Sequence, residues 1–308
     1  MQKNLVFHVY PVASNDAWRW NMGQLRQRLP LFDGKRTIAV AVDDQTDDLA
    51  TVKDYLQVDG IEWIELENDP VLSESATWVP LWESVKEEPG VTFRAHAKGV
   101  TETDKEQTTS YGQGGRSVTA TSWRSIPTAK HRMESMRMWT DLLYRTNLDH
   151  WELVEGMLER KPMVGSFRHD FRRVFRGVIG PAKTFLKAIQ PAWYFMGSFY
   201  WVQNRDFFAR NWRAIPQTYS GVEVWPGLNF SVKESGCLFF STDRGVPMNQ
   251  IEYVKMIREK FLRWERNEQE RFDSSVGHAI RLPEMLDPQD PLDRTRLPGR
   301  CRLEEICR

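Results

Sequence analysis

The feature that most constrains the fold is the alternation of short apolar segments with amphipathic runs in the first hundred residues. Four segments have the length and the β-branched or aromatic content of strands: Asn4–Tyr10, Thr37–Asp44, Ile61–Leu66 and Val91–Ala97. The runs between them repeat apolar residues three or four positions apart, as helices do: 16–32, 46–57 and 75–87. Strands that alternate with helices indicate βαβ units, so we expect an α/β fold with a mainly parallel, Rossmann-like sheet flanked by helices.

The carboxyl ends of the four strands are the expected ligand-binding edge, because ligands of open parallel sheets bind there. The fourth strand ends in His96-Ala97-Lys98-Gly99. A lysine beside the backbone N–H groups of a glycine turn suits a phosphate or diphosphate, although a plain surface lysine would look the same. The second strand ends in Asp43–Asp44. These acids are either solvated at the strand end, with Thr46–Asp48 capping the next helix, or they bind the ribose or base of a nucleotide.

The rest of the chain is more helical. Residues 131–160 predict one or two amphipathic helices, and 252–272 predict a charged helix with one apolar stripe. The polar segment 102–130 follows the Lys98 tip directly and is placed to close over a ligand. The tail from Arg281 is rich in Pro, Asp and Arg, which indicates an extended, wrapping or disordered segment.

One stretch, 166–187, is strongly basic, with a local formal charge of +5 and Asp170 as its only acid. It is either a solvated surface helix or an electropositive rim that meets ligand phosphates, an anionic membrane surface or nucleic acid. Its basic residues are Arg168, Arg172, Arg173, Arg176, Lys183 and Lys187.

Composition excludes several classes. The formal net charge is zero, so no global field steers the protein to nucleic acid or membrane. Three scattered cysteines, no apolar run long enough to cross a bilayer and a first apolar segment interrupted by His8 predict a cytoplasmic protein. The first strand is not followed by GxGxxG, and the sequence has no Walker-type glycine loop, which disfavours dehydrogenases and kinases.

Several motifs together resemble a known family. "VTFRAHAKGVT", "WYFMGSFYWVQNRDFF" and "YSGVEVWPGLNF" are similar to segments of bacterial GT-A-like glycosyltransferases related to the rhamnan-synthesis and other polysaccharide-assembly transferases. "FHVYPV" is similar to their first strand and nucleotide-side loop, and the likeness spans roughly Leu5–Phe240. It implies a GT-A-like domain over 1–245, with a nucleotide-binding half at about 1–100 and an acceptor half at about 131–245. A C-terminal helix and tail would then occupy 246–308.

The resemblance implies transfer of a sugar from a nucleotide-sugar donor to a hydroxyl acceptor, such as a glycan. Such enzymes usually end the fourth strand in a DxD motif that holds a divalent metal on the donor diphosphate. This chain has His96 and Lys98 there. Because a lysine neutralises a diphosphate without a metal, we expect a metal-independent, inverting transfer with no cofactor. His96 would donate a second hydrogen bond or contact the sugar, and Asp43–Asp44 would be the place for a metal if one is needed.

The family pattern also implies roles for individual residues. Glu223 is the expected base that takes the proton of the acceptor hydroxyl, and its apolar neighbours would strengthen it; a helix-start glutamate or a buried ion pair is the alternative. Gly197 and Ser198 would let the chain pass close to a sugar, and Trp201 and Trp225 would stack on sugar faces. The expected donor-binding residues are His8, Tyr10, Asp43, Asp44, His96, Lys98 and Gly99.

Two other functions fit the same sequence. One is a non-catalytic protein that keeps the fold and binds a nucleotide or sugar. The other is a transferase that acts on modified nucleic acid through the basic stretch, which predicts duplex binding that weakens steeply with salt.

Overall fold

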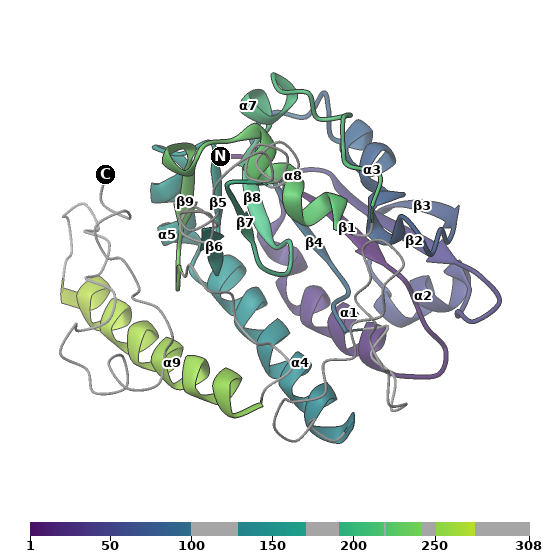
Figure 1. Cartoon of the computed structure of the whole chain (residues 1–308), viewed down its shortest axis with the longest axis horizontal. Coiled ribbons are helices and arrows are strands. Elements are labelled where there is room, and N and C mark those ends of the chain that lie inside the picture. Colours follow the sequence, from purple (N-terminus) through teal and green to yellow (C-terminus); the bar gives the residue numbers. More distant parts are fainter. Residues whose placement is uncertain (100–128, 171–190, 219, 242–250, 275–308) are drawn as a thin grey trace, which may run out of the picture.

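The computed structural model describes residues 1–99, 129–170, 191–218, 220–241 and 251–274. They form a mixed seven-stranded sheet in the order β3-β2-β1-β4-β8-β5-β9, and a separate two-stranded sheet of β6 and β7 (Figure 1). The strands are β1 Lys3–Val9, β2 Arg36–Val42, β3 Glu62–Glu67, β4 Val91–His96, β5 Met163–Gly165, β6 Arg168–Asp170, β7 Trp193–Phe195, β8 Tyr200–Gln203 and β9 Ser235–Cys237.

Helices cover both faces of the large sheet (Figure 1). The α-helices are α1 Ala17–Arg28, α2 Leu49–Leu56, α3 Trp78–Ser84, α4 Ala129–Tyr144, α5 Trp151–Leu158, α7 Asn204–Phe208, α8 Gly221–Asn229 and α9 Ile251–Ser274. Shorter turns are η1 Leu29–Leu31, η2 Ser73–Ser75, the π-helical η3 Arg145–Asp149 and η5 Val232–Glu234.

The predicted α/β architecture is confirmed. All four predicted strands are present, each with ends within two residues of those expected. β1 pairs in parallel with β2 and β4, and β2 with β3. β8 runs antiparallel to both β4 and β5, which makes the sheet mixed and extends it without a break beyond the first four strands.

The sheet separates two hydrophobic cores, because successive side chains of a strand point to opposite faces. Leu5 and Phe7 of β1 join a core with α1, α2 and α4. Val6, between them, joins a second core with α3 and α8. This alternation decides which side chains of β1 and β4 can meet at the site described below.

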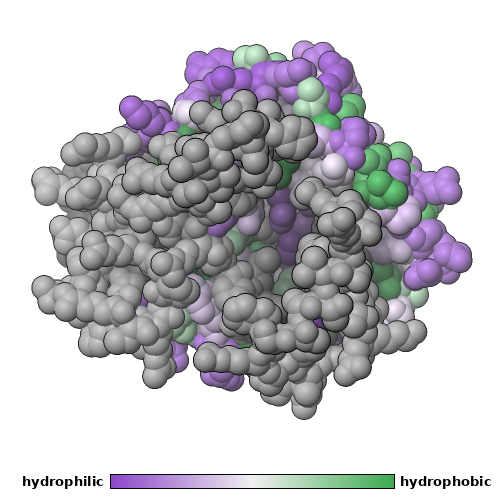
Figure 2. Space-filling model, viewed as in Figure 1, coloured by the Kyte–Doolittle hydropathy of each residue, from purple (hydrophilic) through white to green (hydrophobic). Residues whose placement is uncertain are grey.

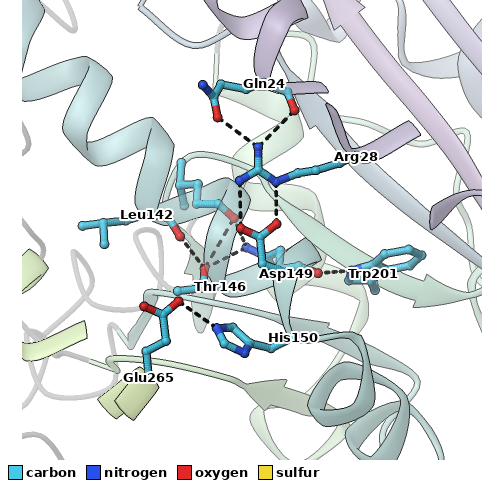
Figure 3. A network of polar contacts seen from close by, with 10 residues as sticks. Gln24, Arg28, Leu142, Thr146, Asp149, His150, Trp201 and Glu265 are labelled. Atoms are coloured by element: carbon cyan, nitrogen blue, oxygen red, sulfur yellow. Dashed lines mark hydrogen bonds and ion pairs between the residues drawn. The ribbon is translucent and has the colours of Figure 1, made fainter. Parts of the chain in front are cut away.

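The C-terminal helix α9 packs along α4, and its predicted apolar stripe is buried. Figure 3 shows the polar contacts that join this region to the sheet. Glu265 of α9 accepts hydrogen bonds from Arg145 Nη2 at 2.5 Å and from His150 Nε2 at 3.2 Å. Nearby, Arg28 of α1 binds Asp149 through two parallel hydrogen bonds of 2.6 and 2.8 Å. The C-terminal helix α9 is therefore joined to the rest of the fold by these contacts.

None of the helices in the described ranges is long and apolar enough to span a bilayer.

The predicted basic rim is wrong for Arg168. This residue begins β6, is 1 % exposed, and its Nη1 donates to the backbone oxygen and hydroxyl of Ser235 at 3.1 Å each. Its Nε pairs with Asp170 at 3.2 Å. A residue engaged in this way cannot form part of an exposed electropositive surface. The other five basic residues of the stretch lie outside the described residues.

Candidate functional site

The order of the strands places the switch point of the sheet between β1 and β4. The chain continues from β1 to β2 and β3 on one side, and then β4 pairs with the opposite edge of β1. Ligands of open α/β sheets bind at the carboxyl ends of the strands at such a switch point. His8 and His96 are register partners near the carboxyl ends of these two strands. In the space-filling view, hydrophilic residues are prominent on the part of the surface that the structure describes (Figure 2).

A buried charge network lies on the α3–α8 face of these strands. Glu74 of η2 accepts a hydrogen bond from Arg94 Nη2 at 2.5 Å, and the same carboxylate oxygen contacts His96 Nδ1. Arg94 Nη1 donates to the backbone oxygen of Ser198 at 2.8 Å. Burial raises the pKa of Glu74, but the charge of Arg94, the hydrogen bond from His96 and the charge of Lys98 outweigh burial and hold that pKa well below its ordinary value. Glu74 is therefore a carboxylate at neutral pH.

His8 and His96 are both neutral near pH 7. Burial lowers the pKa of His96 and lowers the pKa of His8 to about 3. We assign the proton of His96 to Nδ1, because an ionised Glu74 can only accept, and Nε2 then carries a lone pair. Thr77 Oγ1 donates its one proton to the backbone oxygen of Glu74 at 3.0 Å, so it accepts from His8 Nδ1, also at 3.0 Å. Both imidazoles therefore keep Nε2 as a hydrogen-bond acceptor.

The structure places Lys98 at the tip of β4, as predicted, and fixes its backbone. Asn21 of α1 is 1 % exposed and holds Lys98 from both sides. Its Nδ2 donates to the Lys98 carbonyl oxygen at 2.9 Å, and its Oδ1 accepts from the Lys98 N–H at 3.2 Å. Gly99 follows with a φ of +80°, a left-handed conformation that glycine adopts without strain. A side chain on so fixed a backbone carries its charge to a defined place.

Lys98 lies beside Glu223, 125 residues further along the chain. The Lys98 Nζ and Glu223 Oε1 atoms are 3.7 Å apart, and the two side chains are 16 % and 28 % exposed. Glu223 is in the first turn of α8 and so is indeed a glutamate at a helix start that forms an ion pair. Burial and the charge of Glu223 raise the pKa of the nearby Tyr194 to about 12, so this phenol stays protonated. The side chains of Lys98 and Glu223 therefore lie together just beyond the carboxyl end of β4.

The position of α8 depends on close backbone packing. A methyl group on Gly227 would lie 1.8 Å from the carbonyl oxygen of Trp193 in β7, and one on Gly221 would lie 2.1 Å from that of Pro216. Only glycine allows these approaches. The glycines of the "G-x-E-x-W-P-G" segment therefore place Glu223 through helix packing.

A second polar group occupies the ends of β1, β2 and β3. Asp43 Oδ2 accepts from Tyr10 Oη at 2.7 Å and from Asn68 Nδ2 at 2.8 Å, and its Oδ1 accepts from the Gln45 N–H at 2.9 Å. Burial, followed by the hydrogen bond to Asp43, raises the pKa of Tyr10 to about 12. Asp44 is exposed. Hydrogen bonds thus already engage both Asp43 oxygens, and within the described ranges no three His, Cys, Asp or Glu residues form a metal-ligating group.

Of the residues expected to cap the helix, Thr46–Asp48, the last one does so. Asp48 caps α2, accepting from the Thr51 N–H at 2.8 Å. Thr46 instead exchanges hydrogen bonds with the backbone of Asp43, and Asp47 accepts from Trp18 and Arg19. Thr46 therefore stabilises the end of β2, and Asp47 links this loop to α1.

The sugar-stacking role predicted for Trp201 and Trp225 is wrong. Trp201 and Trp225 have no exposed surface. Trp201 stacks on Phe32 and donates through Nε1 to the Asn147 carbonyl oxygen at 2.9 Å (Figure 3). Trp225 packs against Trp78 and other rings of the second core. Neither can offer a face to a sugar, because both strand and helix turn these large apolar rings inward.

Gly197 and Ser198 serve packing as well. Both have positive φ, and a methyl group on Gly197 would lie 2.7 Å from Leu143 Cδ1 of α4. Ser198 is fully buried and supplies its carbonyl oxygen to Arg94. This turn thus reaches the site through the Arg94 network, without exposing either side chain.

Sequence reasoning missed Asn21, Asn68, Glu74, Arg94 and Tyr194. Arg94 did carry a signal, because a charged residue inside an otherwise apolar strand needs a buried partner. The other residues lie in helices, turns or short strands far from their partners in sequence, and no local pattern marks them.

The fold and the site together define an α/β protein with a cluster of polar and charged side chains at the switch point of a mixed sheet. The cluster includes two neutral histidines, a lysine on a fixed backbone and a glutamate from a helix. No protein-family model matches the sequence, and no curated protein matches it at a significant level.

Proposed function

We propose that the chain is a glycosyltransferase of the GT-A type, which moves a sugar from a nucleotide-sugar donor to a hydroxyl acceptor. The observation that carries the proposal is the 3.7 Å approach of Lys98 Nζ to Glu223 Oε1 at the carboxyl ends of β1 and β4. Sugar transfer needs a cation and a carboxylate in the same site. A cation must stabilise the departing diphosphate, and a carboxylate must take the proton of the acceptor.

The arrangement supports a separate role for each group of residues at the site. The nucleoside lies toward Tyr10, Asp43 and Asp44, and the diphosphate lies at Lys98. The acceptor oxygen attacks the anomeric carbon while the bond from that carbon to the diphosphate oxygen breaks, and the electron pair leaves with the diphosphate. Glu223 takes the acceptor proton. This single displacement, with Glu223 as base, inverts the anomeric carbon. Lys98 offsets the charge on the leaving group, so we propose that the transfer needs no divalent metal.

The ion pair itself adds a step to this scheme. While Lys98 and Glu223 are paired, the Lys98 ammonium engages one carboxylate oxygen of Glu223. A bound diphosphate carries more negative charge than Glu223 and competes for the ammonium. Donor binding therefore frees Glu223 for the acceptor, which orders donor before acceptor.

The same ion pair also favours a second candidate function. A non-catalytic protein that binds nucleotides or sugars would keep Lys98 for the phosphates and use Glu223 only to hold the lysine. Such a protein binds the donor without turning it over. The nucleic-acid alternative loses one of its six basic residues, because Arg168 is buried.

The test is a panel of UDP, GDP and CDP and of the corresponding nucleotide sugars. Binding is measured by thermal shift and calorimetry, and turnover by release of nucleoside diphosphate, with and without EDTA. Lys98→Ala should weaken nucleoside diphosphate binding by about 10- to 100-fold, the effect of losing one hydrogen bond to a charged group. Glu223→Gln should leave binding intact and lower turnover by about 100- to 10,000-fold.

Lys86→Ala and Glu83→Gln are matched controls on α3 and the turn after it, with partly exposed side chains of their own, and should change neither quantity. Failure of every nucleoside diphosphate to bind the wild-type protein would refute the transferase. Binding without turnover supports the non-catalytic candidate. Loss of turnover in EDTA refutes only the metal-free mechanism.

A further inference from the structure

His96 has a buried nitrogen without a partner. Its Nε2 atom is shielded from solvent, and no group of the described residues forms a hydrogen bond with it. The residue as a whole is 8 % exposed. Buried polar atoms of this kind are uncommon in native proteins, and a bound molecule is one of the usual reasons for them.

The protein determines what kind of partner this nitrogen can take. Glu74 accepts from Nδ1 and thereby leaves Nε2 with the lone pair, and Arg94 holds Glu74 in place. Phosphate oxygens have no proton to give, so a neutral His96 cannot bind the diphosphate in this tautomer. The partner must be a donor, and a hydroxyl group is the donor that sugars offer in abundance.

The position of His96 indicates which hydroxyl. It is the last residue of β4, two positions before Lys98 and next to the place proposed for the diphosphate, and it lies beside His8 on β1. The group attached to that diphosphate is the donor sugar. We propose that His96 Nε2 accepts a hydrogen bond from a hydroxyl of the donor sugar, and that Glu74 and Arg94 position it to do so; this rests on the proposed function.

The consequence is a defined specificity. A buried acceptor that pairs with a substrate hydroxyl disfavours an analogue without that hydroxyl, because the acceptor is then left unpaired. The donor should therefore be a sugar that keeps its hydroxyl at the position His96 reaches. Replacement of that one hydroxyl by hydrogen should weaken binding by on the order of tenfold.

The experiment separates the sugar from the nucleotide. Calorimetry compares each nucleoside diphosphate with its nucleotide sugar in wild type, His96→Asn and His96→Gln. Asparagine can keep the Nδ1-like donor to Glu74 but has no atom at Nε2, whereas glutamine can place an amide oxygen near Nε2. We expect His96→Asn to lose about tenfold in nucleotide-sugar affinity with nucleoside diphosphate affinity unchanged, and His96→Gln to lose less.

Glu74→Asp tests the positioning role. It keeps the charge that Arg94 needs but withdraws the carboxylate from His96 by one methylene. The ratio of nucleotide-sugar to nucleoside diphosphate affinity should fall, a change that a general loss of stability would not produce. His150→Asn, at the distant contact with α9, is the matched control and should leave this ratio unchanged.

Several results overturn the inference. Equal losses for both ligands in His96→Asn would mean that His96 serves the diphosphate or the fold. No loss for either would mean that Nε2 is satisfied by water. Should the variants fail to fold, nucleotide sugars deoxygenated at single positions test the wild type directly, and equal binding of all of them refutes the proposal. If no nucleoside diphosphate binds the wild type, it is the proposed function that fails.

Discussion

The buried pair Glu74–Arg94 gives the sharpest test of how this site is built. Arg94 is 2 % exposed and Glu74 is 7 % exposed. Glu74→Gln keeps the shape but leaves the guanidinium as an unpaired buried charge, which should lower the free energy of unfolding by about 3–5 kcal/mol. Arg94→Met should cost less, because the pKa of His96 rises once the arginine is gone, and a protonated His96 can then pair with Glu74. The double variant removes both charges and should be more stable than Glu74→Gln alone.

The assay is urea unfolding near neutral pH, followed by tryptophan fluorescence, for the four proteins of the cycle. We expect a coupling energy of at least about 2 kcal/mol between the two positions, the upper part of the range for residues in one network. The exposed pair Lys35–Glu62, with an N–O distance of 2.9 Å, is the control, and its cycle should give less than about 1 kcal/mol. Additive losses at Glu74 and Arg94 would refute the view that the two charges depend on each other.

Three further perturbations test other parts of the structure. Burial lowers the pKa of His8 from 6.5 to about 3, so the unfolded state takes up the proton first as the pH falls. Between about pH 6 and pH 4 this histidine should lower the free energy of unfolding by about 2–3 kcal/mol. His8→Gln should abolish this pH dependence, and His150→Gln should keep it. Gly227→Ala should destabilise the protein by about 1–3 kcal/mol or more, because its methyl group meets a carbonyl oxygen, whereas Gly156→Ala in α5, with open space around it, should stabilise by up to about 1 kcal/mol; equal effects in urea unfolding would contradict the packing account. Phe261→Ala removes a fully buried ring and should cost about 3–5 kcal/mol in the same assay, unless α9 contributes nothing to the domain.

The sequence was sufficient for the local structure. Strands β1 to β4, the three helices between them and the apolar stripe of α9 follow from periodicity, because burial on one face imposes a repeat of two or 3.6 residues. The tip at Lys98 also follows, since a glycine directly after a strand marks its end. These features depend on residues that are close together in the sequence, so the sequence is enough to predict them.

The site depends on contacts between distant residues. Glu74 meets Arg94 across 20 residues, Asn21 meets Lys98 across 77, and Lys98 meets Glu223 across more than a hundred. Trp201 and Trp225 show the converse, because an aromatic residue looks alike in sequence whether it faces a ligand or a core. The sequence by itself determined which segments are strands and helices, and where β4 ends. Only the tertiary structure decided that Lys98 pairs with Glu223 and that Glu74 and Arg94 hold His96, because strand order and helix packing bring these side chains together.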